Sequence, residues 1–534
     1  MSEKAFNLLH EPWIAVIHDT GETELVSMLS LYGDAHRWRG LAGELPTQDV
    51  AVMRLLLAVL HAVFARYDAA GTFAPIESPQ DALLRWKNLH ERGTFPTPPI
   101  EAYLNHYADR FWLIHPEHPF YQVPRLDNAT DYTAPKLNGE LSESGNKVRL
   151  FPQRTGTHKM QLTYAEAARW LLYVNAFDDT SAKPKGKGLP SPGAGWLGKL
   201  GLILAVGENL FQTLMLNLVL LRDGEDQLWD AENPVWEREV KTEQRTAIVL
   251  PDNPSELLTL QSRRLNLHRT GTAIIGYSLL GGDFFPRENA FAEQMTIWRA
   301  SATKKEGTPE YTPRRHDPSR QIWRDFAPLV SRREGVRRPG LVNWLARLTY
   351  EGLLPQKHFR FQTAAVSYGD KDFFVDDVFS DSLSLSTKLL TDLSQHWVER
   401  ISYELEVTEG LVYRVSELAQ RLAKASGDAN GDAQRHSAKQ QAYFRLDKPF
   451  RDWLESIDPE GADMDTVCDA WWQQARRIVR TLGKELVEQC GPQAFIGRVA
   501  KEGSAGQHHS APLAYNRFLS CTTTRESLKG GKQV

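Results

Sequence analysis

From about residue 378 to the C-terminus, apolar residues recur three and four positions apart, and no other feature restricts the fold as strongly. Five segments show this helical spacing: 382–405, 408–425, 438–457, 464–488 and 511–528. Polar stretches such as residues 426–434 separate them. Amphipathic helices joined by short connections pack into bundles. The sequence therefore predicts an all-α C-terminal domain, a helical bundle, over residues 378–534.

The first 377 residues mix short strands with helices. Short strands are expected between residues 5 and 30, and one helix runs from Thr47 to about Arg66. Thr163 and Glu166 form the pattern of a capping box, which predicts a helix that ends near Phe177. The predicted fold class is therefore α+β, with a mixed α/β N-terminal domain over residues 1–377.

Composition and charge limit the function. The 534 residues are 41% hydrophobic and 24% charged, as in folded globular proteins, and the formal net charge is -4. A protein that binds nucleic acid alone is usually more basic. Residues 299–338, however, carry eleven basic and five acidic side chains. This tract is either a solvated basic face or a track for nucleic acid.

The cysteine and histidine positions argue against a metal site or a disulfide framework. Cys468, Cys490 and Cys521 lie far apart and form no CxxC motif, which indicates a reducing cytoplasm. The pairs His115/His118 and His508/His509 have no obvious third ligand, so packing roles are expected. We expect no metal and no cofactor.

Neither a membrane segment nor an enzyme motif is expected. The most apolar stretches, 55–65 and 210–221, are shorter than the ~20 residues of a membrane span and are interpreted as buried helices. The N-terminus lacks the apolar region of a signal peptide. GxSxG and HExxH motifs are absent, and we expect a non-enzymatic, cytoplasmic protein.

A glycine-rich segment is the most informative local feature. Gly193, Gly195 and Gly198 match the pattern GxGxxG, and Lys199 brings the segment close to a P-loop. Glycines at this spacing let backbone N–H groups approach phosphates. Leu200 stands where a P-loop has the Mg²⁺-binding Ser or Thr, and no hydrophobic strand precedes the segment. Three interpretations remain open: a nucleotide site, a flexible connector, or close backbone approach to a polyanion, with flanking lysines Lys183, Lys185, Lys187 and Lys199.

Four segments together resemble a known family. They are FNLLHEPWIAV at residues 6–16, FWLIHPEHPF at 111–120, the glycine segment ahead of residues 210–221, and RFQTAAVS at 360–367 ahead of the helical domain. In order and spacing they are similar to the CasA family, the large subunit of the type I-E CRISPR surveillance complex, Cascade. The resemblance extends over nearly the whole chain.

This resemblance implies a fold and a function. Family members have a mixed α/β N-terminal domain and a C-terminal four-helix bundle. They read the protospacer-adjacent motif in double-stranded DNA, largely from the minor groove, and they have no catalytic site. They help to separate the strands, hold the displaced strand and recruit a nuclease-helicase. The implied partners are the other Cascade subunits, the CRISPR guide RNA and the target DNA.

The resemblance also implies site residues. The minor-groove glycine loop corresponds to Gly193, Ala194, Gly195, Trp196, Leu197, Gly198 and Lys199. The hairpin that contains the strand-separating wedge corresponds to Gln362, Thr363, Ala364, Ala365 and Val366. The loop that contacts the guide and neighbouring subunits corresponds to Gly139, Ser142, Ser144, Gly145, Asn146 and Lys147. Candidate basic contacts are Lys183, Lys185, Lys187, Arg269, Lys304 and Lys305.

Two alternative functions remain: a P-loop-like NTPase built on the glycine segment, and a purely structural scaffold subunit of the same complex. The sequence further predicts that the glycine segment is exposed. A bulky residue at Gly195 or Gly198 is therefore expected to leave folding nearly unchanged.

Overall fold

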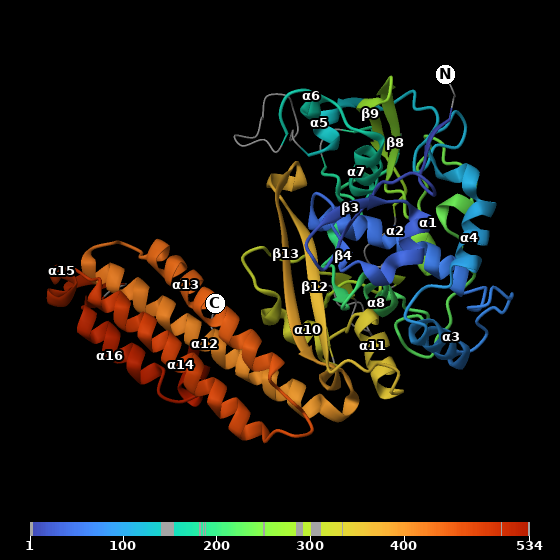
Figure 1. Ribbon diagram of the computed structural model, residues 1–534. Helices are drawn as coiled ribbons and strands as arrows, with labels where there is room; N and C mark the ends of the chain where they lie inside the picture. The colour runs from blue at the N-terminus through green and yellow to red at the C-terminus, as the bar shows by residue number, and fades with distance from the viewer. Residues whose placement is uncertain are drawn as a thin grey trace. The chain divides into compact units, whose positions relative to one another are not determined.

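The computed structural model describes residues 4–139, 154–180, 183–184, 186, 188–248, 251–284, 292–300, 311–333, 335–502 and 505–531 (Figure 1). The chain divides into two compact units. The first unit comprises Met1–Ile322 and Arg332–Leu383, and the second comprises Trp323–Ser331 and Ser384–Val534. The division after Leu383 lies within strand β13, Val375–Ser386, a few residues beyond residue 377.

Helix α2, Pro46–Phe64, runs through the core of the first unit and packs against α7, Tyr164–Phe177, and α9, Pro254–Leu258. Pro46 occupies the first turn of α2, where its missing N–H costs nothing. This helix is long and apolar enough to cross a membrane by length and composition, yet 94% of its apolar window is buried inside the protein. A helix that is hydrophobic on all sides is expected in such a core.

Small antiparallel sheets surround these helices. Their strand orders are β1-β5, β3-β2-β4, β6-β9-β8, β10-β11 and β13-β12-β7. The strands are β1 Ala5–Asn7, β2 Ile14–Ile17, β3 Thr23–Val26, β4 Gly40–Leu41, β5 Trp112–Ile114, β6 Thr130–Thr133, β7 Leu204–Val206, β8 Arg263–Thr270, β9 Ala273–Gly281, β10 Trp298–Ala300, β11 Tyr311–Pro313 and β12 His358–Tyr368. The remaining longer helices of this unit are α1 Met28–Asp34, α3 Pro79–Glu91, α4 Thr97–His106, α8 Leu210–Asn217 and α11 Gly340–Tyr350.

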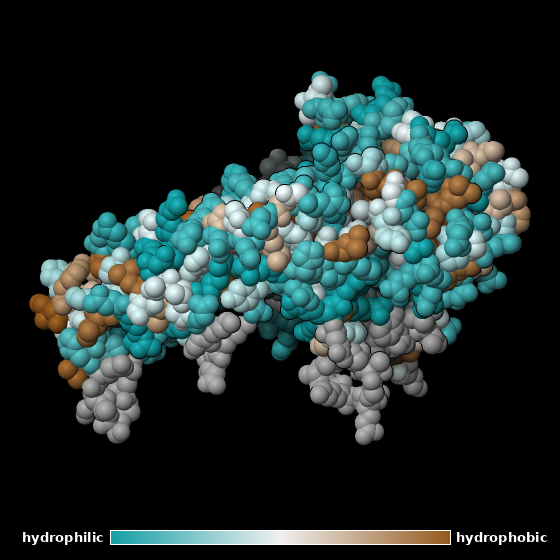
Figure 2. All heavy atoms as spheres, turned by 90° about the horizontal axis from the view of Figure 1, so that it is seen from below, coloured by the Kyte–Doolittle hydropathy of each residue, from teal (hydrophilic) through white to brown (hydrophobic). Residues whose placement is uncertain are grey.

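The second unit is a helical bundle. Its long helices are α12 Gln395–Ser426, α13 Asp432–Glu455, α14 Met464–Glu488 and α16 Ala511–Cys521, and α12 packs against the other three. The rings of Trp323, Phe450, Trp453 and Trp471 fill part of its core, in stacked pairs joined by an edge-to-face contact between Phe450 and Trp471. Exposed apolar residues on α15, Pro492–Ile496, include Ile496, and apolar side chains gather at this end of the bundle in Figure 2.

The α+β fold class and the C-terminal bundle are confirmed, with two corrections of detail. The segments 382–405 and 408–425 were expected to form two helices. Instead, residues 382–386 complete strand β13, and one continuous helix, α12, begins at Gln395. The second unit also contains a hairpin of β14, Arg498–Glu502, and β15, Ala505–His509.

Candidate nucleic-acid interface

The glycine-rich segment follows helix α7, and two exposed glycines, Gly186 and Gly188, precede Gly193 and are counted with the segment from here on. Gly186, Gly188 and Gly193 have φ angles of 82°, 75° and 66°, the left-handed region that glycine adopts without strain. Gly186 and Gly188 are exposed, and Gly193 is half-buried. The Lys199 ammonium lies 3.6 Å from the position of a Cβ atom at Gly193. This stretch therefore combines open backbone with a neighbouring cation.

The later glycines are buried, so the expectation of an exposed segment at Gly195 and Gly198 is wrong. A Cβ atom at Gly195 would come closer than 3.0 Å to the backbone of Ala176, and one at Gly198 closer than 3.0 Å to the Tyr368 hydroxyl. Ala194, Trp196 and Leu197 are also buried. Glycine is required at these positions by close packing inside the unit, and a bulky side chain there would disturb the fold.

A buried ionic cluster holds the segment in place. Arg263 on β8 donates to the Gly193 carbonyl oxygen at 2.6 Å and, through Nε, to the Asp178 carboxylate at 2.5 Å. The Gly195 N–H donates to the Asp178 carbonyl oxygen at 2.8 Å. Trp196 Nε1 donates to Glu293, 3.2 Å away, whose carboxylate is paired with Arg54 of α2. The segment is therefore anchored at three positions, Gly193, Gly195 and Trp196, and is not a loose connector.

Lys183 belongs to this cluster. Its ammonium lies 3.0 Å from the Asp178 carboxylate, and its side chain is 1% exposed. Burial lowers the pKa of Lys183, and the Asp178 charge opposes that effect. Burial would raise the pKa of Asp178, but Lys183 and Arg263 outweigh it and hold that pKa below its ordinary value. In this arrangement Lys183 positions the segment and presents no open cation.

The residues predicted for the strand-separating wedge, 362–366, lie within strand β12 and away from the turn of the hairpin. Thr363, Ala364, Ala365 and Val366 are buried in the middle of strand β12, and Gln362 beside them is half-buried. The turn between β12 and β13 instead contains η7, Asp370–Asp372. Asp370, Lys371 and Phe373 are exposed there, and Phe373 is 40% exposed.

The hairpin turn contacts Thr180, which lies between the end of α7 and the glycine-rich segment. The Thr180 N–H donates to the Asp372 carbonyl oxygen, and the Thr180 hydroxyl donates to the Lys371 carbonyl oxygen, both at 2.8 Å. Arg315 binds the Asp372 carboxylate with two hydrogen bonds of 2.9 and 2.8 Å. The Tyr368 hydroxyl donates to the Phe177 carbonyl oxygen at 2.7 Å. The structure thus brings the two predicted DNA-contacting elements together.

Other predicted residues are not part of this region. Arg269 is exposed on the β8–β9 hairpin, whose tip residue Gly271 accepts a hydrogen bond from Tyr164 at the start of α7. The glycine-rich segment follows the opposite end of α7, about 20 Å away for a helix of 14 residues. Gly139 is described, with φ 72°. The remaining predicted contacts lie outside the described residues: Ser142, Ser144, Gly145, Asn146, Lys147, Lys185, Lys187, Lys304 and Lys305.

Five residues of the candidate interface were not predicted as site residues from the sequence: Asp178, Arg263, Arg315, Tyr368 and Asp372. Two signals were present in the sequence: Asp178 directly after a helix, and the pair Arg263-Arg264 ahead of the alternating Leu265 and Leu267. A charged side chain in a buried strand needs a charged partner. Arg315 stood out only as one cation of the basic tract, because its partner Asp372 is 57 positions away.

The chain order around Lys199 contradicts a P-loop. A P-loop connects a strand to a helix N-terminus. Here α7 precedes the segment, and the three-residue turn η3, Leu197–Lys199, leads into strand β7. Leu197 is buried and lines a small internal cavity together with Leu172 and Ala176 of α7.

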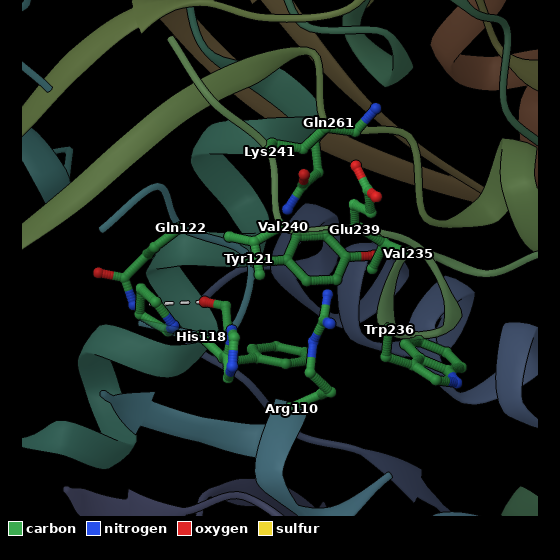
Figure 3. A pocket seen from close by; sticks show the side chains of 12 residues that line it. Arg110, His118, Tyr121, Gln122, Val235, Trp236, Glu239, Val240, Lys241 and Gln261 are labelled. Atoms are coloured by element: carbon green, nitrogen blue, oxygen red, sulfur yellow. Dashed lines mark hydrogen bonds between the residues drawn. The ribbon is translucent and has the colours of Figure 1, made fainter. Parts of the chain in front are cut away.

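A pocket elsewhere in the first unit has no connection to this interface. It contains about 330 Å³ of empty space open to solvent and is lined by Arg110, Tyr121, Trp236 and Gln261, among others (Figure 3). None of the predicted site residues lines it.

Among the described residues, no group of three or more His, Cys, Asp or Glu side chains could hold a metal ion. His115 instead accepts backbone hydrogen bonds from Glu117 and His118.

Comparison with known proteins shows where this fold occurs. The family model described as CRISPR-associated protein Cse1 matches residues 7–482. The protein CasA/Cse1 of Thermus thermophilus is 30% identical over 434 residues, covering 79% of each chain. The crystal structure of Thermobifida fusca Cse1 superposes with a TM-score of 0.81, and the two sequences are 30% identical. The match covers 99% of this chain and 98% of that chain. A chain described as a CRISPR RNA-guided surveillance complex shares the fold at 19% identity, with a TM-score of 0.65 over 90% and 99% of the chains.

Proposed function

The chain belongs to the CasA/Cse1 family of CRISPR-associated proteins, and we propose that it is the DNA-binding large subunit of an RNA-guided surveillance complex. In this role it recognises a short motif in duplex DNA beside the target. It then aids strand separation, holds the displaced strand and helps to recruit a nuclease-helicase. It acts in the cytoplasm with other Cascade subunits and a guide RNA, and has no catalytic activity.

The exposed glycines at the start of the glycine-rich segment carry this proposal. A minor groove is only about 6 Å wide and excludes most side chains, whereas bare backbone can enter it. Gly186 and Gly188 have nothing but solvent or one leucine side chain near a Cβ position, and both have left-handed φ angles. The groove-facing residues in our proposal are therefore Gly186 and residues 188–193, with Gly195 and Gly198 as the packed base of the segment.

Charge supports a role within an assembly. The whole chain has a net charge of -4, so it can neutralise few phosphates and gains little from counterion release. Lys199 beside Gly193 offers one local phosphate contact. Affinity for DNA then comes mainly from the guide RNA and from other subunits, and this chain contributes selectivity for the motif.

The turn of the β12–β13 hairpin is the proposed strand-separating element. It presents a cation, Lys371, and an exposed ring, Phe373. Apolar wedges inserted between base steps unstack DNA, and a neighbouring cation can bind the phosphate of an opened strand. These residues replace 362–366 in the proposed role, because residues 363–366 are buried within the strand.

Purification from the native host tests the proposal. We expect a tagged chain to copurify with guide RNA and a set of repeated subunits. An NTPase would instead bind and hydrolyse ATP with Mg²⁺ as a free chain. Purification of the chain alone, without RNA or partner subunits, contradicts the proposed function.

A further inference from the structure

The hairpin turn contains an unusual backbone conformation. Lys371 and Asp372 are consecutive non-glycine residues with positive φ angles of 53° and 60°. Each such residue costs on the order of 1 kcal/mol or more and persists only where its surroundings hold it in place. The turn must therefore be fixed by contacts outside its own two strands.

Thr180 and Arg315 supply those contacts. Thr180 binds both strained residues at their carbonyl oxygens, once through its N–H and once through its hydroxyl. Arg315 binds the Asp372 carboxylate through both terminal nitrogens. Two parallel hydrogen bonds of this kind fix the orientation of both planar groups, which one bond does not.

Tyr368 joins this contact to the glycine-rich segment. The Arg315 guanidinium lies 5.1 Å from the centre of the Tyr368 ring. The Tyr368 hydroxyl in turn bonds to Phe177, the last residue of α7, and packs directly against Gly198. One continuous set of contacts thus runs from the turn through Tyr368 to the end of α7 and to Gly198 of the glycine-rich segment.

We propose that Arg315 and Asp372 are positioning residues that fix the hairpin turn relative to the glycine-rich segment, so that binding of the motif is coupled to opening of the adjacent base pairs. This inference rests on the proposed function. Neither residue needs to touch DNA in this role, because each acts through the geometry of the turn that carries Lys371 and Phe373.

A purely stabilising role fits the pair less well. The Arg315 and Asp372 side chains are 31% and 30% exposed, and ion pairs that reach solvent contribute little to stability. Their specific effect is on the orientation of the turn. A change in the pair should therefore alter DNA opening much more than the folding of the chain.

Binding of DNA by the assembled, guide-loaded complex tests this inference. Three targets are compared: a duplex with the accepted motif, the same duplex with the base pairs next to the motif mismatched and already open, and the complementary single strand. The variants are Arg315→Gln, Arg315→Lys and Asp372→Asn. Arg125→Gln is the matched control, because Arg125 forms an exposed pair with Asp127.

For Arg315→Gln and Asp372→Asn we expect about a ten-fold loss of affinity for the closed duplex, the order of one lost charged interaction. Affinity for the pre-opened duplex and the single strand should stay within about two-fold, because opening no longer limits binding. Arg315→Lys should also lose affinity for the closed duplex, because an ammonium cannot form the two parallel bonds. The control should behave as the unmodified chain on all three targets.

Two outcomes overturn the inference. One is unchanged affinity for the closed duplex, and the other is an equal loss on the closed and pre-opened duplexes. If Arg315→Gln fails to fold, Asp372→Asn decides between these outcomes, because it keeps the size of the side chain. A failure of the proposed function looks different: the unmodified complex would then bind duplexes with accepted and altered motifs equally well.

Discussion

The Arg263 guanidinium donates a hydrogen bond of 2.6 Å to the carbonyl oxygen of Gly193. Through this bond a residue that is 1% exposed controls the backbone of a glycine at the edge of the proposed DNA-binding surface. Backbone that enters a minor groove must hold its shape without support from its own side chains. The buried cluster of Arg263, Asp178 and Lys183 supplies that support from beneath.

Replacement of Arg263 should destabilise the first unit strongly. Arg263→Gln leaves the Asp178 carboxylate buried with only part of its compensating charge, and removal of one partner of a buried pair costs about 3–5 kcal/mol. The free energy of unfolding in urea measures the effect. Arg269→Gln, an exposed arginine on the same strand, should change it by less than about 0.5 kcal/mol. Equal effects of the two changes would contradict the role of the cluster.

The packed glycines should tolerate even alanine poorly. Gly195→Ala and Gly198→Ala each place a methyl group against atoms that cannot easily move, and overpacking of this kind costs about 1–3 kcal/mol. Gly40 provides the control, because a Cβ atom there has nothing within 4 Å. Thermal unfolding followed by circular dichroism should show lower midpoints for the two packed positions alone. An unchanged midpoint for Gly198→Ala contradicts the contact with Tyr368.

Glu232 should make stability depend on pH. Burial raises the pKa of Glu232 to about 7, although Ser255 donates hydrogen bonds that oppose the shift. Between the ordinary glutamate pKa and about 7, the folded state therefore binds more protons than the unfolded state. This contribution is fully present below the ordinary value and is lost as the pH rises toward 7.

Glu232→Gln removes this titration. The difference in free energy of unfolding, variant minus unmodified chain, should rise by at most about 3 kcal/mol between pH 4.5 and 7. Above pH 7 this difference should level off. The unmodified chain is needed as the reference because His61, buried 3.9 Å from Glu232, also makes stability depend on pH. Burial lowers the pKa of His61 to about 3, so its contribution to the free energy of unfolding changes with pH in the opposite direction. A difference that does not change with pH contradicts the buried, neutral state of Glu232.

Local sequence signals predicted local structure well. The Thr163–Glu166 capping box is present with both hydrogen bonds, and α7 ends at Phe177 as expected. The helix expected from Thr47 begins one residue earlier, because Pro46 fits its first position. Helical periodicity located the bundle but did not separate strand β13 from helix α12, since short apolar repeats fit both elements.

The site was only partly predictable because its geometry depends on distant contacts. A GxGxxG pattern does not distinguish glycines that face solvent from glycines that face Tyr368, a residue 170 positions from Gly198. The predicted position of the wedge, residues 362–366, falls inside strand β12, which continues to Tyr368 and whose residues 360–362 pair with the distant strand β7. Arg315, Asp372 and Thr180 meet through tertiary structure alone.

Selective loss of duplex recognition is the central expectation, and Gly188 is the position that tests it. Gly188→Leu adds a bulky side chain to the exposed glycine surface, and Gly93→Leu is its matched control. Both glycines are exposed, with φ angles of 75° and 70°, and neither has any atom within 4 Å of a Cβ position. The two changes therefore carry the same backbone strain, and only the first lies on the proposed DNA-binding surface.

The decisive measurement is the affinity of guide-loaded complexes containing either variant for a duplex with the accepted motif and for the complementary single strand. We predict that Gly188→Leu lowers affinity for the duplex by at least about ten-fold and changes affinity for the single strand by less than about two-fold. Gly93→Leu should leave both unchanged. Equal loss on duplex and single strand, or loss on neither, would contradict motif reading by the glycine-rich segment.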